Sequence, residues 1–219
     1  MRTGILGGTF DPVHFGHLGI ARAAMGFAGL DRVLLLPCAS PPHKQRRDLT
    51  DGYRRFAMLT LATQDSPDLL ASPHELLRGG TSYTVDTLEG LASELPGDEI
   101  FLILGSDSFV ELETWRSFRE IVRRAALLVV PRPGVEAEEI ARRAPEALTA
   151  ILLPRGAPLP APSAGALPFA AVVEAVSVDI SSTDIRTRAR EGRPITGLVT
   201  APVETYIRRQ GLYGSTVNA

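Results

Sequence analysis

Apolar and polar positions along this chain fall into two kinds of segment that alternate. Short runs that are apolar almost throughout predict buried strands, and the first two are Thr3–Gly7 and Arg32–Pro37. Between them, the apolar residues of His17–Leu30 recur at the spacing of one helix face. A strand, a helix and a second strand in so short a stretch predict a βαβ unit with a right-handed crossover.

The same alternation continues toward the C-terminus. Strands that are apolar on both sides predict a parallel sheet covered by helices on both faces. The later strands are expected in Asp68–Leu76, at Glu99–Gly105, in Ala126–Gly134 and in Phe169–Ile180, and the later helices at Thr50–Asp65, Ser82–Leu95, Ser117–Ala125, Val135–Ile151, Ile180–Gly192 and Pro202–Tyr213.

We expect a single domain over residues 1–219, because no internal repeat and no domain boundary interrupts the alternation. Within it, residues 170–219 supply the last strand, a capped helix and a terminal helix. The stretch 154–168 holds five prolines among alanine, glycine and serine, which predicts an extended connection. Either Thr50 or Asp51 is expected to cap the helix that follows.

The composition of the chain says little about its fold but excludes several classes of function. The chain has 219 residues, of which 44% are hydrophobic, and a net charge of -2. This gives no basic surface for a nucleic-acid polymer, although a mononucleotide needs only a local cluster of cations. No apolar run is long enough to span a bilayer, and the N-terminus lacks a signal-peptide pattern. The single cysteine, Cys38, suits a reducing compartment. We expect a cytoplasmic protein with no membrane partner, and leave a homo-oligomer open.

The opening stretch GGTFDPVHFGH, Gly7–His17, combines a glycine turn with two histidines. Glycines let a ligand approach the backbone, and the following helix directs its free N–H groups and positive dipole end at that turn. His14 and His17 can therefore face one anion. A metal pair is the rival interpretation, but the dipole disfavours a cation and no neighbouring ligand completes a set. Either histidine alone could be an ordinary buried or surface imidazole.

A solitary lysine lies at the same edge of the predicted sheet. All but one of the 23 lysine and arginine residues are arginine, and the exception, Lys44, lies in PCASPPHK after the second strand. A lysine acts on phosphate as a compact point charge, which arginine does not reproduce. We therefore expect Lys44 to touch phosphate, while the neighbouring His43 could equally be a loop residue.

Two further motifs follow predicted strands. In GSDSFVELETW, Asp107 could bind a ribose hydroxyl or organise a cation. Trp115 could offer a flat apolar surface to a heteroaromatic ring or simply pack in the core. In ISSTDIR, hydroxyl groups at a helix N-terminus and an arginine one turn later predict a second anion site. Its members are Ser181, Ser182, Thr183 and Arg186.

Together these motifs resemble the bacterial nicotinate-nucleotide adenylyltransferases, a family of the nucleotidyltransferase superfamily that carries an HxGH motif. The resemblance extends from Gly4 to Tyr213 and is thin only over 135–170. It rests on GGTFDPVHFGHL, PPHK, SYTVDTL, GSDSF with TW, RPG, ISSTDIR and YIRRQGLY. It implies a Rossmann-like, doubly wound parallel α/β fold of nucleotidyltransferase type with a small C-terminal helical part.

The resemblance also implies an activity. Such an enzyme transfers the adenylyl group of ATP to nicotinate mononucleotide in NAD biosynthesis, with Mg²⁺ arriving on ATP and no metal site built from the protein. A phosphate monoester has a second pKa of about 6, so the nucleophile is already ionised and no general base is needed. The site must only neutralise and align two anions.

Site residues follow from the resemblance. His17, His14 and Lys44 are expected to be catalytic. The residues expected to bind ATP are Gly7, Gly8, Thr9, Phe10, His14, His17, Gly105, Asp107, Ser181, Ser182, Thr183 and Arg186. Those expected to bind the acceptor are Lys44, Ser82, Tyr83, Thr84, Asp107, Trp115, Arg116 and Arg132.

Two alternatives stay open. The same chemistry could act on nicotinamide mononucleotide or another phosphate acceptor. The chain could also be a non-catalytic nucleotide-binding module, since fold alone does not imply function. A decayed module is expected to have lost part of the phosphate-binding set, and His14, His17, Lys44 and Arg186 are all present.

Overall fold

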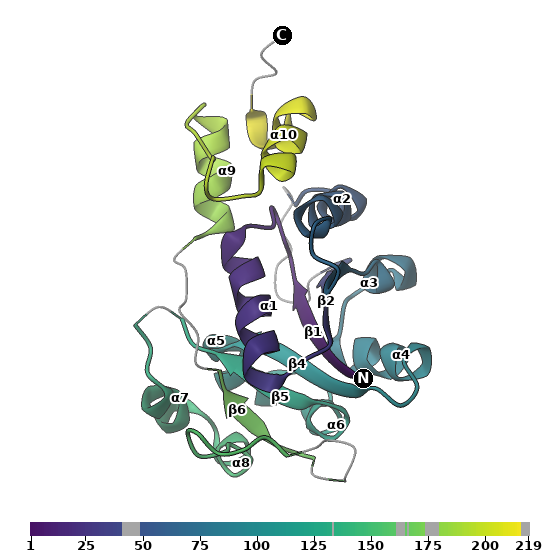
Figure 1. The fold of residues 1–219 in the computed structure, drawn as a ribbon, viewed down its shortest axis with the longest axis vertical. Coiled ribbons are helices and arrows are strands. Elements are labelled where there is room, and N and C mark those ends of the chain that lie inside the picture. Colours follow the sequence, from purple (N-terminus) through teal and green to yellow (C-terminus); the bar gives the residue numbers. More distant parts are fainter. Residues whose placement is uncertain (41–48, 133, 161–164, 166, 174–179, 216–219) are drawn as a thin grey trace.

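Within the described residues, six parallel strands form one sheet at the centre of the molecule (Figure 1). The structure is a computed structural model that describes residues 1–40, 49–132, 134–160, 165, 167–173 and 180–215. The strand order is β3-β2-β1-β4-β5-β6, which confirms the doubly wound Rossmann-like fold. The strands are β1 Arg2–Gly8, β2 Arg32–Pro37, β3 Leu69–Ala71, β4 Glu99–Gly105, β5 Ala126–Val130 and β6 Ala170–Val172.

Helices cover both faces of the sheet because successive strand residues point to opposite sides. Val33 and Leu35 of β2 belong to one buried cluster, with residues of α1, α2, α9 and α10. Leu34 and Leu36 belong to the other, with residues of α4, α6, α7 and α8. The helices are α1 Phe15–Ala28, α2 Gly52–Thr63, α3 His74–Arg78, α4 Thr84–Glu94, α5 Ser106–Val110, α6 Phe118–Arg124, α7 Ala137–Arg143, α8 Glu146–Thr149, α9 Ser182–Arg190 and α10 Ala201–Arg209, with 3-10 turns η1 Leu112–Thr114 and η3 Leu212–Gly214.

Most elements lie where the hydrophobic pattern predicts them, with three differences. The single helix expected over Val135–Ile151 is wrong: Pro145 separates α7 from α8, because proline disfavours helical backbone in the residue before it. The short helices α3 and α5 and the turn η1 were not predicted. Of the strand expected over Phe169–Ile180, β6 is the described part, and residues 174–179 lie outside the described ranges.

The capping of α2 is resolved in favour of Asp51. Its carboxylate accepts hydrogen bonds from the backbone N–H groups of Tyr53 and Arg54, at 3.0 and 3.3 Å. These are orphan donors of the first turn, which a side-chain oxygen commonly satisfies. Asp51 thereby sets the start of α2 at the carboxyl edge of the sheet.

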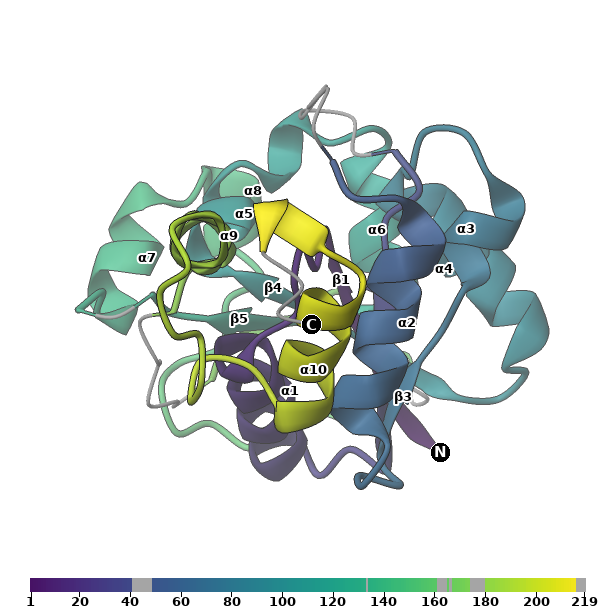
Figure 2. The same ribbon diagram turned by 90° about the horizontal axis from the view of Figure 1, so that it is seen from above.

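The sheet order reverses direction between β1 and β4, so the crevice for a ligand is expected outside their carboxyl ends. The C-terminal helices lie at this end of the molecule (Figure 1), and from above α9, α10 and η3 lie over the sheet (Figure 2). The N–H of Phe15, the first residue of α1, donates to the carbonyl of Leu198 at 3.0 Å. The C-terminal part therefore packs directly beside the predicted phosphate loop.

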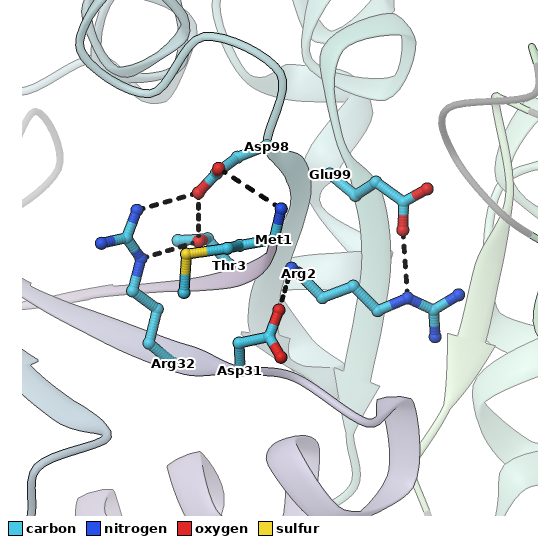
Figure 3. Close-up of polar contacts among 7 residues, drawn as sticks. All are labelled: Met1, Arg2, Thr3, Asp31, Arg32, Asp98 and Glu99. Carbon is cyan, nitrogen blue, oxygen red and sulfur yellow. Dashed lines mark hydrogen bonds and ion pairs between the residues drawn. The ribbon is translucent and has the colours of Figure 1, made fainter.

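The opposite end of the sheet is held by a polar network (Figure 3). The carboxylate of Asp98 accepts hydrogen bonds from Thr3 Oγ1 at 2.6 Å and from Arg32 Nη2 at 2.9 Å, and lies 3.6 Å from the N-terminal amine of Met1. Burial alone would raise the pKa of Asp98, but these hydrogen bonds and positive charges outweigh it and hold the pKa below its ordinary value. One side chain thus joins the starts of β1 and β2 to β4.

We predict that Asp98→Asn lowers the free energy of unfolding by about 1–3 kcal/mol at neutral pH, because a charged hydrogen-bond acceptor is lost. A carboxylate with a lowered pKa stabilises the folded state above its unfolded pKa of about 4, and this stability disappears as the pH falls through the folded value. Urea denaturation from neutral to acidic pH should show the two proteins converging at low pH. A difference that stays constant would contradict the assignment.

Candidate active site

A cavity of about 530 Å³ lies at the carboxyl ends of β1 and β4. Its floor comes from the last residues of both strands, and its walls come from the start of α4 and the segment after α5. The cavity opens at the point where the sheet order reverses, which is where ligands of such sheets bind. The expected site residues that line it are Gly7, Gly8, Thr9, Ser82, Tyr83, Thr84, Gly105, Trp115 and Arg116.

The two histidines lie face to face at the start of α1. His14 is the N-cap residue and His17 lies one turn later, so their rings stack with centroids 3.7 Å apart. The ring of Phe10 meets that of His17 edge-on at 4.9 Å. The N–H of His14 donates to Nδ1 of His17 at 3.3 Å, so the neutral ring of His17 carries its proton on Nε2. His17 is therefore held as an N–H donor.

Both imidazoles are neutral at physiological pH. Burial lowers the pKa of His14 to about 4, and burial together with the charge of His14 lowers the pKa of His17 to about 3. The side chain of His14 faces the backbone N–H of His17 in a capping-box arrangement, although its buried Nδ1 makes no hydrogen bond of standard geometry in the described part of the chain. An unpaired buried nitrogen is unusual and costly. A bound anion can accept a hydrogen bond from the Nε2–H of His17.

The ISSTDIR segment lies against the loop that precedes the histidines. Ser181 caps α9 by accepting from the N–H of Thr183 at 3.2 Å. The hydroxyl of Ser182 donates to the carbonyl of Pro12 at 2.9 Å. The buried guanidinium of Arg186 donates to the carbonyl of Asp11 at 2.6 Å and to Thr183 Oγ1 at 3.1 Å. These four residues do not line the cavity, and their contacts bring the start of α9 against the histidine loop.

Asp11 joins the same loop to two distant segments. Its Oδ1 accepts from the hydroxyl of Tyr213 at 2.7 Å, and its Oδ2 accepts from the N–H of Thr50 at 3.4 Å. Burial and the charge of Asp11 raise the pKa of Tyr213, so this hydroxyl stays protonated. The sequence analysis missed both side chains, although each lies inside a motif that it quoted. Their pairing could not be found locally, because they are far apart in sequence.

Asp107 and Arg132 do not line the cavity. Their side chains form an ion pair at 2.6 Å, and both are substantially exposed. Arg116 lies at the cavity, with its guanidinium over the ring of Tyr83 at 4.7 Å and in an ion pair with Asp86 at 3.5 Å. Lys44 and His43 fall in 41–48, outside the described residues. The contact of Lys44 with phosphate stays a prediction.

The cavity lining includes residues that the sequence analysis did not select. Glu75 of α3 is buried and accepts from the hydroxyl of Thr87 at 2.8 Å. Burial raises the pKa of Cys38, which keeps its thiol protonated. Ser82 was expected to bind the acceptor, and its hydroxyl accepts from the N–H of Ala39 at 2.9 Å. This bond fixes the segment after β2 against the start of α4.

The described ranges contain no cluster of three or more His, Cys, Asp or Glu side chains that could hold a metal ion. None of their helices has the length and hydrophobicity needed to cross a membrane.

Known proteins resemble this chain along nearly its whole length. The family model described as Cytidylyltransferase-like matches residues 5–188. A protein of Geobacter sulfurreducens named "Probable nicotinate-nucleotide adenylyltransferase" is 44% identical over 215 residues, which is 97% of this chain and 98% of that protein. A protein of Desulfatibacillum aliphaticivorans with the same name is 39% identical over 225 residues, covering 97% of this chain and 100% of that protein.

A solved structure shares the fold at low sequence identity. The nicotinic acid mononucleotide adenylyltransferase of Plasmodium falciparum, complexed with NaAD, superposes with a TM-score of 0.73 at 17% identity and covers 99% of both chains. At this identity the likeness concerns the arrangement of strands and helices and carries no residue roles.

We predict that the histidine pair makes the free protein less stable in mild acid. A histidine whose folded pKa lies below its unfolded value of about 6.5 costs nothing above that pH. As the pH falls below about 6.5, the histidines take up protons in the unfolded chain but not in the folded one. The free energy of unfolding therefore decreases until the pH reaches the folded pKa values of about 4 and 3. The double variant His14→Asn/His17→Asn should escape this decline.

The measurement is chemical denaturation of both proteins at several pH values between about 7.5 and 4.5. Relative to the variant, the wild type should lose about 1 kcal/mol or more of unfolding free energy over this range. Parallel curves would show that the two imidazoles titrate normally.

Proposed function

We propose, because the chain belongs to the nicotinate-nucleotide adenylyltransferase family of cytidylyltransferase-like proteins, that it transfers the adenylyl group of ATP to nicotinate mononucleotide. The products are nicotinate adenine dinucleotide and pyrophosphate. The observation that carries the proposal is the stacked, neutral pair His14 and His17 at the start of α1, directly after the glycine turn that lines a cavity at the β1/β4 crevice. The two histidines themselves do not line this cavity. This arrangement suits two anionic substrates that meet at one edge of the sheet.

The substrates divide the site between them. We assign the ATP phosphates to the glycine turn and the N-terminus of α1, where Gly7 and Gly8 allow close approach and the positive end of the helix dipole faces the anion. We assign the pyridine ring of the acceptor to the cavity wall at Trp115, Tyr83 and Thr84. An aromatic side chain offers a flat apolar surface to a heteroaromatic ring, and this wall carries two.

The reaction needs alignment and charge stabilisation rather than a base. A phosphate oxygen of the acceptor forms a bond to the α-phosphorus of ATP. The bond from that phosphorus to the bridging oxygen breaks, and its electron pair leaves with pyrophosphate. Because the attacking monoester is already ionised near neutral pH, no proton has to be removed first. Holding both groups in line then supplies much of the rate.

His17 is our choice for the donor that acts in the transition state. Its Nε2–H is free to donate because Nδ1 is occupied by the N–H of His14. The equatorial oxygens of the α-phosphoryl group gain charge as pyrophosphate departs, so a fixed donor binds them more tightly than in the ground state. His14, at the N-cap of α1, is better suited to hold the bound phosphates.

Mg²⁺ is proposed to enter as part of the ATP substrate. The ion neutralises phosphate charge and prefers oxygen ligands and water. The described side chains offer no ready-made cluster for it, so its ligands would come mainly from the phosphates. Lys44 is proposed as a further cation for the phosphates, on the ground of its position after β2. We keep the cytoplasm as the expected compartment.

Nicotinamide mononucleotide is the second candidate acceptor, because the lining contains a carboxylate. Glu75 is buried in the cavity wall, and an amide N–H₂ group would suit a carboxylate better than nicotinate would. Against this, Glu75 already accepts from Thr87, and the guanidinium of Arg116 lies at the same cavity. Arg116 adds positive potential that favours the acid.

The proposal is tested by pyrophosphate release from ATP with each acceptor in turn. We expect kcat/KM for nicotinate mononucleotide to exceed that for the amide by at least about tenfold, the size of one well-placed polar contact. Excess chelator should abolish turnover. A preference for the amide would replace the acceptor, and no turnover with any mononucleotide would favour a non-catalytic module.

We predict that His17→Ala lowers kcat by a factor of about 10²–10³ while the KM for ATP changes little, because one transition-state donor is lost. His14→Ala should weaken ATP binding as well as turnover. The matched control is His74→Ala on α3, whose ring lies against Gly90 and pairs with Glu94 outside the cavity lining. Steady-state kinetics on folded variants, checked by circular dichroism, should separate the three. A normal kcat in His17→Ala would remove it as the donor.

A further inference from the structure

We infer that Arg55 is a positioning residue that clamps three backbone segments around the active site. This inference rests on the proposed function for its assay, but its structural basis is separate. Arg55 lies in the first turn of α2 and is only 1% exposed. It is the largest fully buried side chain in the described part of the chain. A charged residue is rarely buried so completely without a specific reason.

The guanidinium donates to three carbonyl groups from three different segments. Nη1 donates to the carbonyl of Thr9 at 2.7 Å, directly after β1. Nη2 donates to the carbonyl of Cys38 at 2.6 Å, directly after β2. Nε donates to the carbonyl of Thr50 at 2.8 Å, just before α2. One side chain thereby ties the loop after β1 and the loop after β2 to the start of α2.

Charge balance argues against a purely stabilising role. Within the described ranges, the polar contacts of Arg55 are the three carbonyls and the sulfur of Cys38, and none of them is a carboxylate. A buried cation whose hydrogen-bond partners are all neutral costs free energy, and an apolar side chain of similar volume is often as stable or more so. The planar guanidinium is retained, we argue, because it sets the geometry of these loops.

Two of the clamped residues belong to the site itself. Thr9 and Cys38 both line the cavity, and the N–H of Cys38 donates to the carbonyl of Gly8 in the glycine turn at 2.9 Å. The N–H of Thr50 also reaches Asp11, which lies between that turn and His14. Displacing the guanidinium would therefore shift the phosphate loop and the segment after β2 together.

Arginine is required because its nitrogens spread over a rigid plane. A lysine ammonium is a point charge on a flexible stem and cannot reach three acceptors that lie in different directions. Arg55→Lys keeps the charge and removes the clamp. Met58→Ala is the matched control, because Met58 is buried on the same helix, contributes no cavity lining and leaves a destabilising void in the core when truncated.

We expect Arg55→Lys to lower kcat/KM for ATP and for the acceptor by at least about tenfold in protein that is folded at the assay temperature. Hydrogen–deuterium exchange should increase at the amides of Cys38, Ala39 and Thr50 in the ligand-free protein. Met58→Ala should lower the Tm comparably, keep kcat/KM within about twofold and leave exchange at these amides unchanged.

The inference is overturned if Arg55→Lys keeps kcat/KM within about twofold of wild type, or if Met58→Ala loses as much activity. Arg55→Gln carries the same test where the lysine variant does not fold. Failure of both to fold, with Met58→Ala folded, would assign Arg55 to stability alone. An inactive wild type would reject the proposed function. The exchange measurement needs no turnover, so it would still test whether Arg55 holds these loops.

Discussion

The site depends on how one short loop is held between the end of β1 and the start of α1. This loop carries Asp11, whose backbone carbonyl accepts from Arg186 and whose carboxylate accepts from Tyr213 and Thr50. Three segments that are remote in sequence thus end on one buried residue. Because buried polar groups are costly when unpaired, each of these bonds also fixes the segment that supplies it. These bonds to Asp11 therefore fix the positions of the glycine turn before it and the histidines after it.

In the free protein, the positive potential of the site does not come from charged histidines. Two stacked imidazoles cannot both be charged in a buried setting, and burial keeps both neutral. The positive potential comes instead from the N-terminus of α1 and from the buried guanidinium groups of Arg186 and Arg55. Fixed donors of this kind need no reorganisation when charge develops, which is what a phosphoryl-transfer step requires.

The sheet and most helices could be predicted because their signals are local. Apolar runs give β1, β2, β4 and β5, and parallel strands bring the motifs after them to one edge. Only tertiary contacts, by contrast, reveal the role of Arg55. Its place in the apolar stripe of α2, with Met58 and Leu59, was the one available hint. The bond between Asp11 and Tyr213 joins residues separated by 202 positions, and a single sequence carries no trace of it.

The two ends of the sheet differ in role: the polar network at the starts of the strands stabilises the fold, and the carboxyl ends carry the candidate active site. At the starts of the strands, Asp98 gathers opposite charges and holds β1, β2 and β4 together. At the other end, buried arginines bind backbone carbonyls rather than carboxylates, so positive charge remains for a ligand. The two networks share strands but no side chains, and sites that share no partners are expected to act independently. Charges at the starts of the strands are thus paired directly, whereas the buried arginines at the binding edge have neutral hydrogen-bond partners.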